Sequence, residues 1–496
     1  MTFETLLLSC YSLFLFILVL SGTHGYSMVW LYRRKCRMPD PPPPSLPNPL
    51  PTVTIQIPLY NERYVARRII HACAAFDYPR DRFDIQVLDD STDDTLIITR
   101  SLVAQLQAQG IRISHHHRKD RTGYKSGALR EGLAAAEGEF IAIFDADFAP
   151  AEDFLHTTLP YFANDRIGMV QTRWGHLNDQ YSALTRLQAI ALDGHLVIEQ
   201  TARNRSGLFM NFNGTAGVWR KATILDAGNW EDDTLTEDMD LSYRAQMRGW
   251  EFLFLRDSIS PAELPTEMNA LKSQQFRWTK GNVETARKIL PRLWRAPVSL
   301  KQRLAGTSHL LSWLSNPCIL GVALLNPPLT LLHWQRFGIY PLALLLIAFG
   351  LGFFGALALH MQAQQATYPD WRRRMLWFPL FMSGGMGLSI NNTIAVIEGL
   401  LGKKTPFIRT PKYHITEETD NWAGKEYMSR PNMVILLEAA MALYCMTGLV
   451  LAAGKGHWAA LPFHLLFTKG FFTLFWYSLQ HHRASRKALL PHTAEA

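Results

Sequence analysis

The stretch Phe140-Ile141-Ala142-Ile143-Phe144-Asp145-Ala146-Asp147 decides the fold expected for the first half of the chain. Its first five residues are apolar throughout, which is typical of a strand covered on both faces. The alanine-rich segment 125–137 before it has the composition of a helix. A buried strand that follows a helix and ends on two acids favours a parallel α/β sheet. In such sheets ligands bind beyond the carboxyl ends of the strands.

The same alternation of apolar strands and helices runs upstream of this stretch. It predicts strands at 53–58, 83–88 and 111–114, and helices at 62–76, 95–110 and 125–137. Strand 83–88 also ends on two acids, Asp89 and Asp90. We therefore expect an α/β domain with a Rossmann-like, mostly parallel sheet at 53–266, in which both acid pairs lie at one edge. The proline-rich segment 39–52 that precedes it is a stiff linker.

The composition indicates a protein that lies partly in lipid. The chain has 50 Lys plus Arg and 42 Asp plus Glu, yet only 19% of residues are charged and 48% are hydrophobic, with 14 Trp and 27 Phe. The net charge of +8 does not favour nucleic acid as a partner, because the basic residues cluster beside apolar segments. The five cysteines are scattered without metal spacing, so we expect no disulfide framework.

Long apolar segments predict helices that cross a membrane. Segment 6–30 exceeds the roughly 20 residues that a span requires, and Arg33, Arg34, Lys35 and Arg37 follow it at once. Because positively charged flanks stay in the cytoplasm, we expect an integral protein of the cell (inner) membrane with its catalytic domain in the cytoplasm. Further spans are predicted at 304–332, 340–363, 433–453 and 458–479, with a turn near 334–338.

Segment 376–401 is apolar but is interrupted by Asn391, Asn392 and Glu398, and basic groups flank it on both sides. We expect it to lie in the cytoplasmic interface, which gives five spans in all; a six-span arrangement is the alternative. The expected order is a transmembrane helix with a basic flank (1–38), the linker (39–52), the α/β domain (53–266), interfacial helices (267–300), transmembrane helices (301–479) and a basic cytoplasmic tail (480–496).

The two acid pairs are candidate ligands for a metal and a nucleotide. Asp145 and Asp147, at i and i+2 on a loop, can hold a hard divalent cation that bridges a nucleotide diphosphate. Asp89 and Asp90 form a second pair in the same sheet, and two such pairs rarely arise by accident. The alternative for Asp89 is a turn or a helix cap before Ser91.

Other polar residues at the strand ends are candidate donor ligands. Tyr60 can stack on a base and Glu62 can accept a hydrogen bond from it, although Asn61 beside them also suits a helix cap. Lys125, at a helix start, can reach a diphosphate. The run His115 to His117 cannot converge on one metal from a single strand, and we interpret it as solvated. The polar turn Phe212-Asn213-Gly214-Thr215 can approach a sugar closely.

The segment 236–278 supplies further chemistry of group transfer. Asp238 is the candidate general base, which an acceptor hydroxyl needs within hydrogen-bond reach; a capping box that begins at Thr236 is the alternative interpretation. After a short buried strand at 252–255, a helical stretch carries an arginine that can hold phosphate, Arg277, and an indole that can stack on a sugar ring, Trp278.

These motifs, taken in order, resemble those of the inverting family 2 glycosyltransferases, above all the membrane-embedded cellulose synthase-like enzymes of the glucomannan (mannan) synthase branch. The matching segments are 56–62, 86–93, 123–129, 143–148, 212–215, 236–238 and 274–278. The resemblance implies a GT-A fold, a Mg²⁺ or Mn²⁺ ion on Asp145 and Asp147, and a nucleotide contact from Asp89 or Asp90. It makes Asp238 the base. The remaining residues that it assigns to the acceptor and diphosphate are Glu237, Gln274, Arg277 and Trp278.

Segment Phe407-Ile408-Arg409-Thr410-Pro411-Lys412 resembles the gating-loop motif F-x-V-T-x-K of cellulose synthases, with Arg409 in place of the valine. We therefore expect a gate-like loop near 403–413.

Three functions fit these expectations. The first is a metal-dependent processive β-glycosyltransferase that takes glucose or mannose from UDP-glucose or GDP-mannose, extends a β-glucan or mannan, and passes it across the membrane. The second is a non-processive transferase that glycosylates a lipid acceptor. The third, a transport or scaffold protein with a dead transferase domain, is disfavoured because the acid set is intact.

Overall fold

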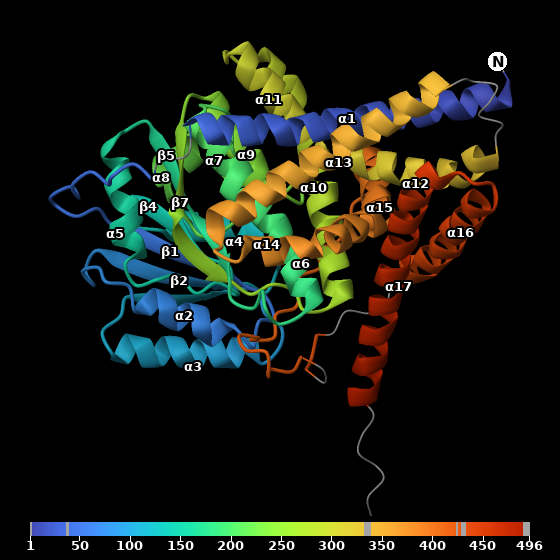
Figure 1. Cartoon of the computed structure of the whole chain (residues 1–496). Coiled ribbons are helices and arrows are strands. Elements are labelled where there is room, and N and C mark those ends of the chain that lie inside the picture. Colours follow the sequence, from blue (N-terminus) through green and yellow to red (C-terminus); the bar gives the residue numbers. More distant parts are fainter. Residues whose placement is uncertain (1, 36–38, 332–338, 423–424, 428–432, 490–496) are drawn as a thin grey trace, which may run out of the picture.

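The computed structural model describes residues 2–35, 39–331, 339–422, 425–427 and 433–489. Arg37, the predicted turn at 334–338 and the end of the predicted tail at 490–496 lie outside these residues. Figure 1 shows an α/β body from which long helices extend to one side.

The described residues form a seven-stranded sheet with strand order β3-β2-β1-β4-β6-β5-β7. The strands are β1 (Val53–Leu59), β2 (Phe83–Asp89), β3 (Ile113–His117), β4 (Phe140–Ile143), β5 (Ile167–His176), β6 (Gly217–Arg220) and β7 (Glu251–Ala262). Neighbouring strands run parallel except at β6, which is antiparallel to both β4 and β5. The mostly parallel sheet predicted from the apolar strands is thus confirmed.

Helices cover both faces of this sheet. They are α2 (Ala66–Ala74), α3 (Thr95–Ala108), α4 (Tyr124–Ala135), α5 (Phe154–Thr158), η1 (Leu159–Ala163), α6 (Ala183–Asp193), η2 (Gly194–Gln200), α7 (Thr201–Arg205), α8 (Lys221–Asp226) and α9 (Glu237–Met247). Two apolar cores result, one on each face, and β4 contributes Phe140 to one and Ile141 to the other. The apolar run 140–144 therefore contains a central strand that is buried from both sides.

One helix start differs from the prediction. The helix expected from residue 62 begins only at Ala66, and its first turn is not capped by Asn61. Asn61 has φ +55°, and its Oδ1 accepts a hydrogen bond from the backbone N–H of Thr92 at 2.8 Å. The asparagine therefore links the loops after β1 and β2 and does not cap α2, so the predicted cap at this position is wrong.

The remaining helices are α1 (Phe3–Lys35), α10 (Met268–Arg295), α11 (Leu300–Leu310), η3 (Ser312–Leu314), α12 (Ser315–Leu331), α13 (Ile339–Thr367), α14 (Trp371–Arg374), η5 (Met375–Trp377), α15 (Phe378–Leu401), α16 (Val434–Gly454), η6 (Trp458–Ala460) and α17 (Leu461–Leu489). Helices α1 and α13 lie side by side (Figure 1). Within the described residues, four segments are long and apolar enough to cross a membrane: Phe3–Lys35, Leu300–Leu331, Trp371–Leu401 and Val434–Gly454. This supports a membrane protein.

The segment that contains α15 is among these candidate spans, whereas the sequence favoured an interfacial helix. The polar residues that suggested the interface are used inside the helix bundle. Asn391 Nδ2 donates to the carbonyl of Lys272 at 3.0 Å, and Asn392 Nδ2 donates to Asn316 Oδ1 at 3.1 Å. Because neighbouring helices satisfy these amides, they do not require contact with water. Helices α13 and α17, predicted as spans at 340–363 and 458–479, are not among the four.

Candidate active site

A cavity of about 200 Å³ lies at the carboxyl ends of β1, β2 and β4, between the sheet, α9, α10 and the loop 403–413. Its walls bring together nearly all of the predicted site residues: Tyr60, Glu62, Asp90, Lys125, Asp145, Asp147, Glu237, Asp238, Gln274, Arg277 and Trp278. The exception is Asp89. The strand ends thus bring together polar and aromatic side chains that are spread over more than two hundred positions of the sequence. This is expected for a sheet of this type.

Lys125, at the start of α4, lies at the centre of the cavity. Its Nζ lies 2.5 Å from Asp145 Oδ1 and donates to the carbonyl of Gly214 at 3.0 Å. The backbone N–H of Asp145 donates in turn to Thr215 Oγ1 at 2.8 Å. The predicted sugar-facing turn 212–215 and the acid pair after β4 are therefore held against each other by one lysine and one threonine.

Gly214 allows this close approach. Its φ is +84°, a conformation that residues with a side chain rarely adopt, and an added Cβ would lie 3.0 Å from Asp238 Oδ2. The glycine thereby lets the carboxylate of Asp238 approach the same turn that accepts from Lys125. Asp145, Asp238 and the turn 212–215 therefore lie close together.

Asp238 and Glu237 form the first turn of α9. Burial, followed by the negative charge of Glu237, raises the pKa of Asp238 to about 7, although Lys125 opposes the shift. Burial also raises the pKa of Glu237. A carboxyl group with a pKa near neutrality can both accept and release a proton at physiological pH, which suits a general base. The alternative capping box is not formed, because Thr236 makes no side-chain cap and its Oγ1 lies 3.0 Å from Thr285 Oγ1.

Asp147 is paired with a lysine from a distant part of the chain. Lys412 Nζ lies 2.5 Å from Asp147 Oδ2 and also contacts the carbonyl of Glu263. Glu263 is only 2% exposed, and its carboxylate accepts from the backbone N–H of Tyr413 at 2.8 Å and from Arg68 at 3.1 Å. The loop 403–413 is thereby fastened to the acid pair that was predicted to hold a metal.

The two acids after β2, Asp89 and Asp90, have different surroundings. Asp89 is fully buried, does not line the cavity, and accepts hydrogen bonds from the backbone N–H of Ser91 at 2.8 Å and from Thr99 Oγ1 at 2.7 Å. Asp90 lines the cavity and binds Arg118 through both oxygens, at 2.6 and 2.7 Å. Of the two acids only Asp90 lines the cavity, and the nucleotide contact stays a prediction. Asp89 instead supports the turn, which is the alternative that the sequence left open.

The histidine run on β3 is not solvated as the sequence suggested. His115 Nε2 lies 3.0 Å from Asp89 Oδ2, and His117 Nδ1 lies 3.0 Å from the carbonyl of Asp89. These partly buried rings therefore belong to the support of the turn after β2.

An aromatic and cationic stack borders the cavity at Tyr60. The guanidinium of Arg121 lies 3.2 Å from the centre of the Tyr60 ring. Tyr124 stacks on Phe407 of the gate-like loop with ring centres 5.8 Å apart. Planar groups of this kind can exchange one stacking partner for another, so a nucleobase fits where Arg121 now lies on Tyr60.

Glu62 faces the loop and not the Tyr60 ring. Arg409 lies 3.2 Å from Glu62 Oε2. Burial raises the pKa of Glu62 to about 8 even though the charge of Arg409 opposes that shift. In this structure Glu62 is paired with the arginine that replaces the valine of the gating motif, and its predicted contact with the donor stays a prediction.

Helix α10 presents its predicted motif to the cavity and to the same loop. Arg277 donates to the carbonyl of Ile408 at 2.9 Å, and its guanidinium lies 4.5 Å from the ring centre of Phe407. One turn further, the fully buried Lys280 contacts Thr405 and the carbonyl of Lys403. The loop thus covers the cavity and is tied down by α10 at its beginning and by the sheet at its end.

Three features of the site were not predicted from the sequence. The sequence did not single out Arg121 or Glu263, and the partner of Lys412 could not be inferred. No local signal marked Glu263, because the apolar part of β7 ends at Leu255 and a largely polar stretch separates it from the acid. No local pattern connects residues 412 and 147.

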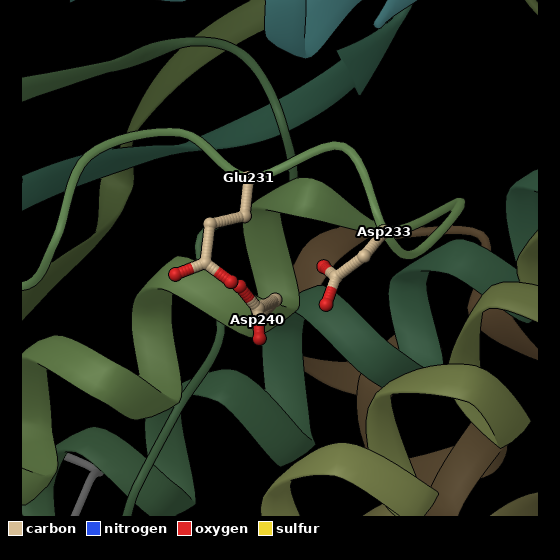
Figure 2. Close-up of side chains that lie close together, drawn as sticks. All are labelled: Glu231, Asp233 and Asp240. Carbon is tan, nitrogen blue, oxygen red and sulfur yellow. The ribbon is translucent and has the colours of Figure 1, made fainter.

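A different acid cluster is not a convincing metal site. Glu231, Asp233 and Asp240 present carboxylate oxygens within 4.8 Å of one another (Figure 2). Lys288 Nζ already contacts all three. Since an ammonium compensates their charge and none of the three lines the cavity, we interpret the cluster as an ion-pair network that joins α9 to α10.

The acid pair Asp145 and Asp147 fits a divalent cation better. Its oxygens are hard ligands at the end of a buried strand, and each is matched with a lysine ammonium in this structure. Both acids line the cavity, which none of Glu231, Asp233 and Asp240 does, so a Mg²⁺ or Mn²⁺ ion that displaced these ammonium groups could reach a bound diphosphate.

Comparisons with known proteins agree with this site. The model of the family described as "Glycosyltransferase like family 2" matches residues 51–281. Residues 51–281 are a glycosyltransferase family 2 domain. This glycosyltransferase domain contains every predicted site residue that lines the cavity.

Curated relatives extend the similarity. Glucomannan 4-beta-mannosyltransferase 7 of Arabidopsis thaliana is 39% identical over 316 residues, which cover 60% of this chain and 57% of the relative. Glucomannan 4-beta-mannosyltransferase 1 of Cyamopsis tetragonoloba is 45% identical over 244 residues, which cover 48% and 46%. The chain spans about half the length of the curated relatives it matches.

Among solved structures, the mannosyltransferase PcManGT from Pyrobaculum calidifontis, in complex with GDP-Man and Mn²⁺, aligns with a TM-score of 0.51. It is 19% identical and is covered completely, while 79% of this chain is covered. At this identity the likeness is one of fold, and it agrees with the GT-A fold of the glycosyltransferase domain.

Proposed function

We propose that this protein is a processive, inverting β-mannosyltransferase that extends a β-linked mannan or glucomannan from a nucleotide-activated mannose. The observation that carries the proposal is the convergence of Asp238, Lys125 and Asp145 on the turn at Gly214. The similarity to glucomannan 4-beta-mannosyltransferases supports mannose as the sugar. GDP-mannose is accordingly the first donor to test, and nothing in these relatives' names supports UDP-glucose.

In this proposal each group has a role in the reaction. Asp238 accepts the proton of the acceptor hydroxyl as the oxygen of that hydroxyl attacks the anomeric carbon of the donor. The bond from this carbon to the diphosphate oxygen breaks in the same step, and attack from the opposite face inverts the anomeric configuration. Arg277 and Lys125 hold the negative charge that accumulates on the leaving diphosphate.

The other site residues bind and orient the substrates. Tyr60 and Asp90 line the cavity and would contact the base and ribose of the nucleotide, and Gln274, Trp278 and Glu237, which also line it, would contact the acceptor. A Mg²⁺ or Mn²⁺ ion held by Asp145 and Asp147 would supply further positive charge against the diphosphate. Closure of the loop 403–413 would exclude water, which otherwise competes with the acceptor hydroxyl.

We place the glycosyltransferase domain in the cytoplasm, on the cell (inner) membrane, with the product leaving through the helical region. The basic flank of α1, at Arg33, Arg34 and Lys35, supports this orientation. The division of the chain predicted from the sequence, with a domain at 53–266 and interfacial helices at 267–300, is part of the same proposal.

One observation favours transfer to a lipid as the second candidate. A cavity of about 500 Å³ lies between α1, α6, α10, α12, α13, α15 and α17, and its walls are mostly apolar. Such a cavity suits an acyl chain at least as well as a sugar chain.

The test is turnover by the purified full chain in detergent or vesicles. Labelled GDP-mannose and UDP-glucose are supplied separately with Mn²⁺ or Mg²⁺, and the product is sized. We expect long product from GDP-mannose, lost in Asp238→Asn and retained in Asp165→Asn, a matched change at a side chain that is 99% exposed. Label found only in the lipid extract would instead establish the glycolipid function.

A further inference from the structure

A π-helical turn, η2, joins α6 to α7 without a break in the helix. π-helical turns are rare, displace side chains from their α-helical positions, and occur frequently at functional sites. This one contacts β5 and β7 on one side and α1 and α13 on the other. It is therefore one of the segments through which the sheet meets the first candidate membrane helix, beside α7 and the direct contact of Arg256 with Tyr32.

The apolar side of the turn anchors it to the membrane helices. Val197 and Ile198 of η2 belong to a buried cluster with Met28 and Val29 of α1 and Leu359 of α13. The position of the turn is thus fixed relative to α1 by side-chain packing.

The polar side of the turn points toward the active site. Glu199 Oε2 lies 2.9 Å from His195 Nδ1, and Glu199 Oε1 lies 3.4 Å from His24 Nε2 of α1. The other nitrogen of His195, Nε2, lies 3.4 Å from Asn213 Oδ1. The carboxylate of Glu199 and the amide oxygen of Asn213 both accept hydrogen bonds, and the His195 ring lies between them. Burial alone would raise the pKa of Glu199, but the two histidines outweigh it and hold the pKa well below its usual value.

Three further bonds fix the turn that contains Asn213. Gln200, next to Glu199, donates to the carbonyl of Asn211 at 2.7 Å. Asn211 Nδ2 donates to Asn213 Oδ1 at 2.7 Å, and the backbone N–H of Asn213 donates to Gln171 Oε1 at 3.0 Å. The amide oxygen of Asn213 therefore has two hydrogen-bonding neighbours, Asn211 and His195. Among the described residues, its buried Nδ2 has no hydrogen-bond partner, although Asn213 lines the active-site cavity.

An amide donor that lacks a partner in the described part of the chain, on a residue that lines the cavity, has a candidate ligand in a sugar hydroxyl. The acceptor sugar fits better than the donor, because Asn213 adjoins Gly214, and Gly214 lies against the base Asp238. The attacking hydroxyl has to lie beside that base. Glu199 and His24 also line the cavity between the membrane helices, so the group lies between the site of transfer and the helices.

We propose that Glu199 and His195 are positioning residues for the transfer reaction. Through the amide of Asn213 they aim one hydrogen-bond donor at a hydroxyl of the acceptor sugar, and through His24 they fix that donor relative to the first membrane helix. The inference rests on the proposed function. The simpler alternative is a clamp that only holds α1 against the domain.

The two alternatives differ in which kinetic constant responds. Glu199→Gln, His195→Gln and Asn213→Ser are prepared in the full chain and assayed in detergent with GDP-mannose and a short β-linked manno-oligosaccharide. Loss of one oriented hydrogen bond should raise the acceptor KM by about tenfold, with the donor KM and the affinity for GDP unchanged. Glu199→Asp should restore part of the loss. His71→Gln, a change at an exposed histidine of α2, serves as the matched control.

A double-mutant cycle between residues 199 and 213 makes the test independent of folding yield. If Glu199 acts through Asn213, the combined variant should be no worse than Asn213→Ser alone. Additive losses, or an unchanged acceptor KM in both single variants, overturn the inference. Lower thermal stability with equal changes in donor and acceptor KM also overturns it and assigns the clamp. Absence of transfer by the unaltered chain would overturn the proposed function itself, whereas normal transfer with unaffected variants removes only this inference.

Discussion

Lys412 Nζ and Asp147 Oδ2 lie 2.5 Å apart, although 265 positions separate the two residues in the chain. The lysine belongs to the gate-like loop 403–413, and the aspartate belongs to the pair that we propose as the metal site. A divalent cation and this ammonium compete for the same oxygen, so closing the loop and loading the metal are coupled through one carboxylate.

Replacing the lysine should therefore strengthen metal binding. Lys412→Met leaves Asp147 without its ammonium, and we expect Mn²⁺ to bind about tenfold more tightly, equivalent to about 1.4 kcal/mol. Turnover should fall, because the loop loses its attachment to the sheet. Titration of the nucleotide-free protein with Mn²⁺ measures the affinity, and Lys404→Met, at an exposed position of the same loop, is the control. An unchanged Mn²⁺ affinity would show that the lysine and the metal do not share the carboxylate.

The pH dependence of turnover should report the state of Asp238. A general base has to be ionised, and burial followed by Glu237 raises the pKa of Asp238 to about 7. The value of kcat/KM, which reflects the free enzyme, should then fall by about tenfold per pH unit below pH 7. Glu237→Gln removes the neighbouring negative charge and should move this fall to lower pH. A profile that is flat between pH 5 and 8 would exclude Asp238 as the base.

We expect Asp89 to contribute to stability and Asp90 to contribute to donor binding. Burial alone would raise the pKa of Asp89, but hydrogen bonds from His115, Ser91 and Thr99 outweigh it and lower the pKa. Asp89 thus stabilises the fold above the pKa of an unfolded aspartate, and this contribution is lost as the pH falls through the lower folded value.

Asp89→Asn should accordingly lower the melting temperature at pH 7, with little change in the donor KM of the protein that remains folded. Asp90→Asn should raise the donor KM several-fold, because Asp90 lines the cavity. Thermal unfolding and donor kinetics of the two variants, measured side by side, check both parts. The division of roles is refuted if Asp89→Asn changes donor KM as strongly as Asp90→Asn.

The sequence predicted those features that depend on local patterns. The apolar runs that became β1, β2 and β4 were recognisable because both faces of the sheet are covered, and the acids that follow them had to gather at one edge. The direction of β6 was not predictable, since a four-residue strand has no pattern that distinguishes parallel from antiparallel pairing. Asn61 appeared to be a helix cap because its residue type suits that role, yet tertiary contact with Thr92 determines its conformation.

Other parts of the site depend on packing between distant segments. Arg409 meets Glu62, and the π-helical turn brings His195 to Asn213, only when the loop and the helices are in place. The spacing of 195 and 199 is equally compatible with an ordinary helix. The amides of α15 likewise suggested an interface, because the sequence did not reveal the partners Lys272 and Asn316 that satisfy them.

A buried ion pair connects the site helix α10 to a candidate membrane span. Lys272 Nζ lies 2.6 Å from Glu438 Oε1 of α16 and donates to Ser478 Oγ of α17 at 2.7 Å. The two charged side chains are 5% and 0% exposed. Lys272 lies only two positions before Gln274, so this pair fixes the helix that presents the predicted motif to the cavity.

Removing one partner of this pair should lower the free energy of unfolding strongly, whereas replacing both partners with apolar residues should not. Glu438→Gln leaves the Lys272 ammonium uncompensated, which typically costs about 3–5 kcal/mol, and thermal unfolding in detergent should show a large loss of stability. The double variant Lys272→Met with Glu438→Leu should recover most of that loss, because neither charge then remains buried. Lys403→Gln removes a lysine that is 64% exposed from its pair with Glu398, which keeps Lys280 nearby, and should cost no more than about 1 kcal/mol. If Glu438→Gln were as mild as Lys403→Gln, the pair would not be what holds α10 against α16.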